Sequence, residues 1–250
     1  MSGHNKWSSI KHRKGAQDQK RGKVFTKLIR DITIAVKESG KDQETNAKLR
    51  AALEKARVAN MPKDTVNLAI KRGAGEIQGE SFEEFNYEGY GPGGVAILLE
   101  ILTNNRNRAA SEVRNIFERH SGNLGETGCV GWLFERKGLI CIQDDTVTED
   151  KLMDLSLEAG AEDIRHEKDE FMVTTDPASF EKVKTTLEKA GLTLNSAELT
   201  MIPQNTVKLD GKNAEKMLKI MDALEELDDV QNVYANFEID EEIIEQFMEK

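Results

Sequence analysis

The 250-residue chain has few of the features that mark a secreted or membrane-embedded protein. It contains only two cysteines, Cys129 and Cys141, too few for a disulfide framework and not arranged as a CxxC pair. No apolar run reaches the roughly 18 residues of a membrane-spanning helix. The basic start is not followed by the apolar stretch of a secretory signal. With 38% hydrophobic and 32% charged residues, the composition is that of a globular protein, and we expect it in the cytoplasm.

Residue patterns of common catalytic and metal sites are also missing. The four histidines (His4, His12, His120 and His166) do not occur in HxxxH, HExxH or Cys/His spacings. No GxSxG nucleophile motif occurs. The glycines of segment 89–94 lead into an apolar run with no lysine, which favours a tight turn over a phosphate-binding loop. The sequence therefore predicts a protein that is not an enzyme and has no metal or cofactor.

Charge is divided unevenly along the chain. Residues 1–75 contain 18 Lys and Arg against 7 Asp and Glu, whereas the rest contains 17 basic and 38 acidic residues. Residues 1–30 alone have nine basic residues and one acid, Asp18. A basic end on an acidic protein is typical of directed contact with a polyanion. The acidic runs, such as Glu225-Glu226 and 240–242, are predicted to be solvated helix faces.

Apolar periodicity predicts a small helical domain after a glycine-punctuated arm at 1–22. Apolar residues recur at helical spacing from Val24 to Val36, and that helix is expected to end near Gly40. Further helices are predicted over 46–60 and from Pro62 to Gly73.

Short strands alternate with helices in the remainder. Strands are predicted at 85–90, 94–103, 130–134, 139–143, 170–174, 196–202, 206–209 and 230–238. Helices are predicted at 106–120, 149–159, 178–189 and 214–226, a loop at 123–128, and a short acidic amphipathic tail at 241–250. This alternation indicates an α+β fold.

The arm and the first helix contain the residues most suited to nucleic acid. Lysine and arginine displace counterions from phosphates, and a tryptophan can stack on an exposed base. The candidate residues are Lys6, Trp7, Lys11, His12, Arg13, Lys14, Lys20, Arg21, Lys23 and Lys27. Trp7 is equally suited to anchoring the arm on the helical domain.

A secondary basic set consists of Arg106, Arg108 and Arg114, followed by Arg119. Their surroundings are acidic, and pairing with those acids is the favoured interpretation.

Several segments, which follow one another in the same order along the chain, resemble the YebC family. They are 3–18 (GHNKWSSIKHRKGAQD), 20–30 (KRGKVFTKLIR), 87–94 (YEGYGPGG), 104–108 (NNRNR) and 122–125 (GNLG), the last shortly before 132–134 (WLF). The resemblance extends over nearly the whole chain. Asn5 departs from it, because the family more often has serine there.

The resemblance implies an N-terminal helical domain followed by two small α/β domains, the third inserted into the second. The expected boundaries are 1–79 for the arm and helical domain, 80–128 plus 204–240 for the second domain, and 129–203 for the inserted one. The family is usually described as transcriptional regulators that bind DNA. Its mitochondrial relatives activate translation of cytochrome c oxidase, and bacterial relatives are linked to the ribosome.

Three functions remain open on the sequence alone. The first is a DNA-binding transcriptional regulator, and the second is a translation factor that places the arm on ribosomal RNA. The third is a protein–protein adaptor that acts through the acidic α/β domains. DNA and ribosomal RNA are the expected partners, with no membrane and no small-molecule substrate.

Overall fold

The computed structural model describes residue 7 and residues 21–79, 81–167 and 169–248. These residues form two compact units, each with its own hydrophobic core. The inserted unit covers residues 132–206, and the main unit contains the other described residues. None of the helices in these ranges is both long and apolar enough to cross a membrane.

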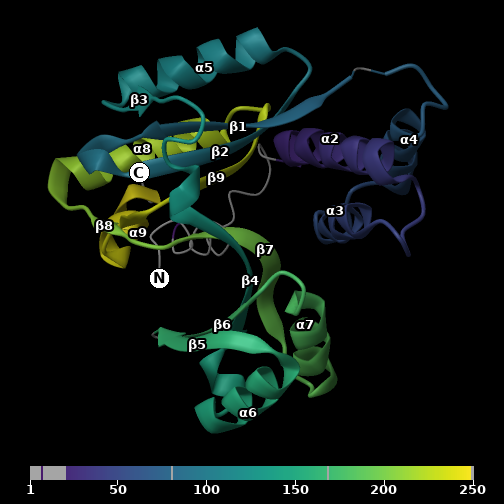
Figure 1. Ribbon diagram of the computed structural model, residues 1–250, viewed down its shortest axis with the longest axis vertical. Helices are drawn as coiled ribbons and strands as arrows, with labels where there is room; N and C mark the ends of the chain where they lie inside the picture. The colour runs from purple at the N-terminus through teal and green to yellow at the C-terminus, as the bar shows by residue number, and fades with distance from the viewer. Residues whose placement is uncertain (1–6, 8–20, 80, 168, 249–250) are drawn as a thin grey trace. The chain divides into compact units, whose positions relative to one another are not determined.

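Three helices form the N-terminal part of the main unit in the described residues: α2 (Arg21–Ser39), α3 (Ala47–Val58) and α4 (Lys63–Gly73) (Figure 1). Asn46 caps α3 by accepting the Leu49 N–H at 2.9 Å, and its amide donates to the carbonyl oxygens of Ala35 and Gly40. Leu28, Ile32, Leu49 and Ala69 lie in the shared core. The close approach of α4 to α2 needs Gly73, because a Cβ there would lie 2.5 Å from the Thr33 carbonyl oxygen.

The α/β part of the main unit is built on a four-stranded antiparallel sheet in the order β3-β1-β2-β9. Its elements are β1 (Glu83–Tyr90), a 3₁₀ turn (Pro92–Gly94), β2 (Ala96–Thr103), α5 (Arg106–Arg119), β3 (Asn123–Leu124), α8 (Gly211–Glu225) and β9 (Val230–Ala235). A two-stranded parallel pair, β8 (Val207–Lys208) and β10 (Phe237–Glu238), and helix α9 (Glu241–Met248) complete it.

Strand β2 is buried along almost its whole length, as its apolar sequence predicts. Ile97, Leu99 and Ile101 alternate along the strand and pack in one core with residues of α5 and α8. Asn105 caps α5 by accepting the Arg108 N–H at 3.1 Å. The basic helix α5 is therefore fixed directly after the central strand.

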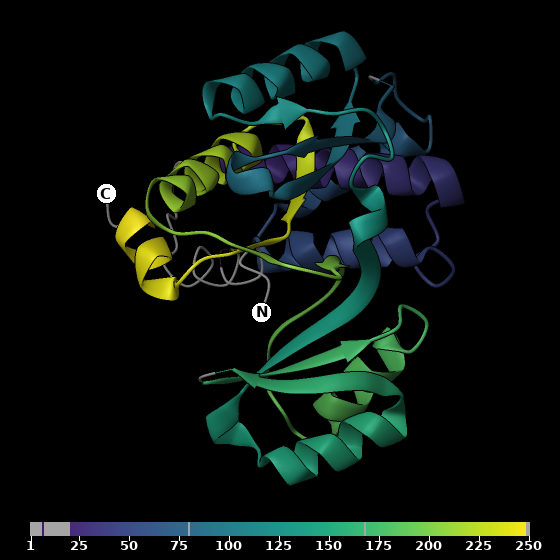
Figure 2. The same ribbon diagram turned by 60° about the vertical axis from the view of Figure 1, so that its left-hand side comes forward.

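The inserted unit has the element order β4 (Phe134–Gln143), α6 (Glu149–Ala159), β5 (Ala161–Glu167), β6 (Glu170–Thr175), α7 (Phe180–Lys189) and β7 (Leu194–Pro203). Its antiparallel sheet has the order β5-β6-β4-β7, which with this βαββαβ sequence is the ferredoxin-like arrangement. Both helices lie on one face of the sheet (Figure 2) and share its core.

The strand predictions for this region were partly wrong. Residues 130–134 and 139–143 are not two strands, because β4 continues through Glu135-Arg136-Lys137 and pairs with β7 along that stretch. Strand β5 was missed because it lies at the sheet edge and is largely polar. The predicted loop at 123–128 contains the short strand β3, and the predicted strand 230–238 is divided into β9 and β10.

The chain has an α+β fold, with an N-terminal helical domain followed by two small α/β domains, the third inserted into the second. The predicted residue boundaries between these domains stay predictions.

Candidate nucleic-acid interface

Most of the arm proposed to bind phosphate lies outside the described residues. This applies to Lys6, Lys11, His12, Arg13, Lys14 and Lys20. Arg21 is the first residue of α2. Trp7, Lys23 and Lys27 are described together with their side chains.

Trp7 is buried in the core of the α/β part, with 1% of its surface exposed. Its indole Nε1–H donates to the Glu225 carboxylate at 2.8 Å, and its ring packs against Phe247 of α9 with centroids 5.9 Å apart. Trp7 is therefore an anchor on the α/β core, and the alternative of an anchor on the helical domain is wrong. Stacking on a base would require the indole to leave this core.

Lys23 and Lys27, on α2, are directed toward the C-terminal end of α8. The Lys23 ammonium donates to the carbonyl oxygen of Glu226 at 3.1 Å and also to its carboxylate. Lys27 donates to the carbonyl oxygen of Glu225 at 2.8 Å. The last carbonyls of a helix carry partial negative charge, so these two lysines stabilise the end of α8.

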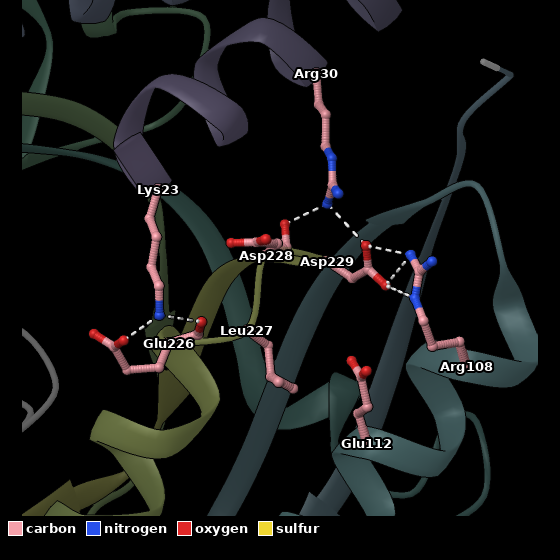
Figure 3. Close-up of a pocket in the computed structure, with 8 residues that line it drawn as sticks. All are labelled: Lys23, Arg30, Arg108, Glu112, Glu226, Leu227, Asp228 and Asp229. Atoms are coloured by element: carbon pink, nitrogen blue, oxygen red, sulfur yellow. Dashed lines mark hydrogen bonds and ion pairs between the residues drawn. The ribbon is translucent and has the colours of Figure 1, made fainter. Parts of the chain in front are cut away.

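Asp229 is the centre of the same contact region and is almost fully buried. Arg30 of α2 donates to its Oδ1 at 2.8 Å, and Arg108 of α5 donates to its Oδ2 at 2.9 Å. Arg30 also donates to the carbonyl oxygens of Leu102 and Asp228. One buried carboxylate thus joins two helices that lie far apart in the sequence (Figure 3).

A cavity of about 350 Å³ lies beside these contacts. It is lined by Lys23, Arg30, Arg108, Glu112, Glu226, Leu227, Asp228 and Asp229 (Figure 3). Four carboxylates therefore outnumber three cations, and Lys23, Arg30 and Arg108 each already contact an acid. An anion such as a phosphate would be repelled here, so this cavity is suited to holding α2 against the acidic segment 225–229.

The secondary basic set divides between two roles. Arg108 pairs with Asp229, as its acidic surroundings predicted. The Arg106 guanidinium lies over the Phe85 ring, 4.5 Å from its centroid. Arg114 is exposed on α5. Arg106 and Arg108 therefore each have a partner within the main unit.

Sequence reasoning missed Asp229 and the neighbouring acids as partners of the basic helix. The sequence predicts a solvated helix face for Glu225-Glu226 and does not single out Asp228 or Asp229. The signal that could have identified a partner is Leu227-Asp228-Asp229 directly before the apolar strand β9, because a residue at the start of a buried strand is itself close to the core.

Asp31 lies on α2, within the electrostatic influence of Lys55 on α3 and of Glu84 and Glu100 on the sheet. Burial raises the pKa of Asp31 to about 6; Lys55 opposes this, whereas the nearby carboxylates Glu84 and Glu100 add to it. Ionisation of the Asp31 carboxyl is therefore less favourable in the folded protein than in the unfolded chain.

Cations that are not used in these internal contacts lie on α3 and α4. Arg57, Lys63, Lys71 and Arg72 are exposed, and within the described ranges none has a side-chain hydrogen bond or ion pair. They are therefore available for an external polyanion, whereas Lys23 and Lys27 are engaged.

Two family models account for most of the chain. One, described as the TACO1/YebC protein N-terminal domain, matches residues 5–76, and the other, described as the TACO1/YebC second and third domain, matches residues 82–237. The chain belongs to the TACO1/YebC family. The YebC-type N-terminal domain thus contains helices α2, α3 and α4 with their exposed cations.

Similar proteins within this family carry regulator names. The chain is 59% identical to a probable transcriptional regulatory protein of Geobacter sulfurreducens, over 99% of this chain and 100% of that protein. It is 58% identical to a probable transcriptional regulatory protein of Citrifermentans bemidjiense, again over 99% of this chain and 100% of that protein. A crystal structure of a conserved hypothetical protein from Aquifex aeolicus matches with a TM-score of 0.79 and 49% identity, covering 89% of this chain and 92% of that one. The family is therefore one of regulator-like proteins.

Proposed function

We propose that this protein is a non-enzymatic, cytoplasmic regulator of gene expression that binds nucleic acid through its basic N-terminal region. The observation that supports this most directly is the set of exposed cations on α3 and α4, Arg57, Lys63, Lys71 and Arg72, which have no internal partner among the described residues. The arm cations at 6–20 extend the same basic region in the sequence. Phosphate neutralisation by these residues gives affinity that depends strongly on salt.

The test measures binding of a fluorescein-labelled 20-base-pair duplex of random sequence as salt is raised. Changing Lys11, Arg13 and Lys14 together to alanine should flatten the slope of log affinity against log salt by about three, close to one for each phosphate that is no longer neutralised. An unchanged slope would overturn the proposal that the arm binds phosphate. The matched control changes Lys23 and Lys27, whose ammonium groups already contact α8, and should flatten the slope by less than one per residue.

In the first version of this function the protein is a DNA-binding transcriptional regulator, as the names of its relatives suggest. A cognate promoter fragment should then bind about a thousandfold or more tightly than random duplex. Equal affinities for promoter and random DNA would remove this version.

In the second version the same region binds ribosomal RNA. Ribosomes should then co-sediment with the intact protein at physiological salt and not with a chain that lacks residues 1–22. Failure of the intact protein to co-sediment would remove this version.

A further inference from the structure

A second cavity, of about 540 Å³, opens between α3 and α4. Its lining consists of Leu53, Ala56, Arg57, Asn60, Met61, Pro62, Lys63, Val66 and Asn67. No carboxylate belongs to this lining, and both charged residues are cations. The cavity therefore has the opposite charge balance to the one beside Asp229, and it favours an anionic ligand.

Three kinds of chemistry meet in this cavity. Leu53, Met61 and Val66 supply apolar surface. The Asn67 side-chain amide can donate and accept hydrogen bonds, and Asn60, whose Nδ2 donates to the Val58 carbonyl oxygen at 3.5 Å, retains a second N–H and its amide oxygen. Arg57 and Lys63 supply positive charge, and a guanidinium can also stack on the plane of a base. An apolar surface, paired donors and acceptors, and flanking cations together match a nucleobase with its phosphates.

We infer that the α3–α4 cavity receives one unpaired nucleotide of a single-stranded or looped nucleic acid. The base contacts the apolar surface and the two asparagines, and Arg57 and Lys63 hold the adjacent phosphates. The volume suits this ligand, because pockets for molecules of nucleotide size occupy about 300–1,000 Å³. A base stacked inside a duplex cannot enter such a cavity without leaving its pair.

This inference rests on the proposed function and makes it more specific. An acidic amphipathic peptide is the competing occupant, because it also combines negative charge with apolar side chains. The two asparagine amides favour the nucleotide, since the edges of a base present donors and acceptors that apolar side chains lack.

The experiment compares three labelled probes by fluorescence anisotropy: a U12 RNA, a T12 DNA and a 12-base-pair RNA duplex. The intact protein should bind one or both single strands at least about fivefold more tightly than the duplex. Asn67→Leu removes an exposed amide without changing charge, and it should weaken single-strand binding about five- to tenfold, the value of one or two hydrogen bonds, with duplex binding unchanged. Arg57→Ala/Lys63→Ala should weaken single-strand binding further.

The matched control is Lys71→Ala/Arg72→Ala, which removes the same charge from exposed positions of α4 outside the cavity lining. It should weaken all three probes by the same factor. Circular dichroism melting of every variant separates weaker binding from impaired folding. The comparison of U12 with T12 then distinguishes RNA from DNA as the source of the nucleotide.

Suppose that Asn67→Leu and Arg57→Ala/Lys63→Ala weaken the binding of single strands and of the duplex by the same factor. That result would overturn the inference and leave the proposed function intact. Absence of binding to every nucleic-acid probe would overturn both. The protein could instead bind a 12-residue Glu/Leu amphipathic peptide and not the single strands, with peptide binding weakened by Asn67→Leu. That result would assign the cavity to a peptide and also overturn the inference.

Discussion

Asp229 shows how one side chain can join helices from distant parts of the sequence. The residue is 3% exposed, and its carboxylate accepts from Arg30 and Arg108. Asp229→Asn should destabilise the protein by about 2–4 kcal/mol, because two arginines then face a neutral amide at a buried point. Urea denaturation would measure the change.

Asp228 is the matched control for this substitution. It is exposed, and only its backbone carbonyl accepts from Arg30. Asp228→Asn should alter stability by less than about 0.5 kcal/mol. Similar destabilisation by the two variants would mean that the Asp229 carboxylate has no special structural role.

Asp31 gives the folded protein a pH dependence of opposite sign to that of most paired carboxylates. Its pKa is raised from 3.8 to about 6, so the folded state holds more protons than the unfolded state between these values. The free energy of unfolding should therefore fall as pH rises through this window. Asp31→Asn should remove that fall and stabilise the protein at pH 7 by about 1–2 kcal/mol.

Urea titrations at several pH values between 4 and 7 would check this prediction. Asp64→Asn, at an exposed position of α4, should retain the pH dependence of the intact protein. A profile that is unchanged in Asp31→Asn would contradict the assignment.

The loop after β3 is held to strand β1 by one glutamate side chain. Glu88 of β1 is buried and accepts backbone N–H groups of Gly128, Val130 and Gly131 at 2.7, 2.8 and 2.6 Å. Burial by itself would raise the pKa of Glu88, but these three donors hold it below the usual value. The carboxylate thus fixes the loop that leads to residue 132.

Glu88→Gln should loosen this loop, because an amide has only one acceptor oxygen for three donors. We expect destabilisation by about 1–3 kcal/mol and faster hydrogen exchange at the three amides. The stability that the charged group provides is present above the ordinary glutamate pKa of 4.5 and is lost as pH falls through the lowered folded value. Glu126→Gln, an exposed change in the same loop, should leave exchange at these amides unaltered.

Element predictions from sequence succeeded where apolar periodicity was strong and failed where tertiary contacts decided the structure. Helix α5, with Ala109, Val113 and Phe117 buried, follows from spacing alone. Strand β5 has no such signal, because an edge strand can form from polar residues once its neighbour β6 is in place.

The candidate site was predicted only in part, for a related reason. Sequence identifies cations but not their partners. Lys23, Lys27 and Arg30 belong to the basic region in sequence, and the fold brings them to Glu225, Glu226 and Asp229 about 200 positions later. The cavity between α3 and α4 could not be anticipated, because it depends on how two helices pack.

At the scale of the whole molecule, the inserted unit begins and ends at adjacent points of one sheet. Phe134 pairs with Pro203, and the Gln204 N–H donates to the Leu133 carbonyl oxygen at 2.9 Å. Its core is also its own. Residues 132–206 should therefore fold alone, with dispersed amide NMR signals and one cooperative thermal transition.

Val173→Asp is the control for this fragment. It places a charge in the fully buried core and should abolish the transition. An intact fragment that is as unfolded as Val173→Asp would show that the unit depends on the rest of the chain.

The two tryptophans of this chain lie in contrasting surroundings: Trp7 is 1% exposed and Trp132 is 67% exposed. Iodide in solution should therefore quench emission from Trp132 and spare Trp7. In Trp132→Phe the remaining fluorescence comes from one blue-shifted reporter beside Glu225 and Phe247. A red shift on adding a polyanion would then reveal, without any attached dye, that the Trp7 indole has left its contacts with Glu225 and Phe247.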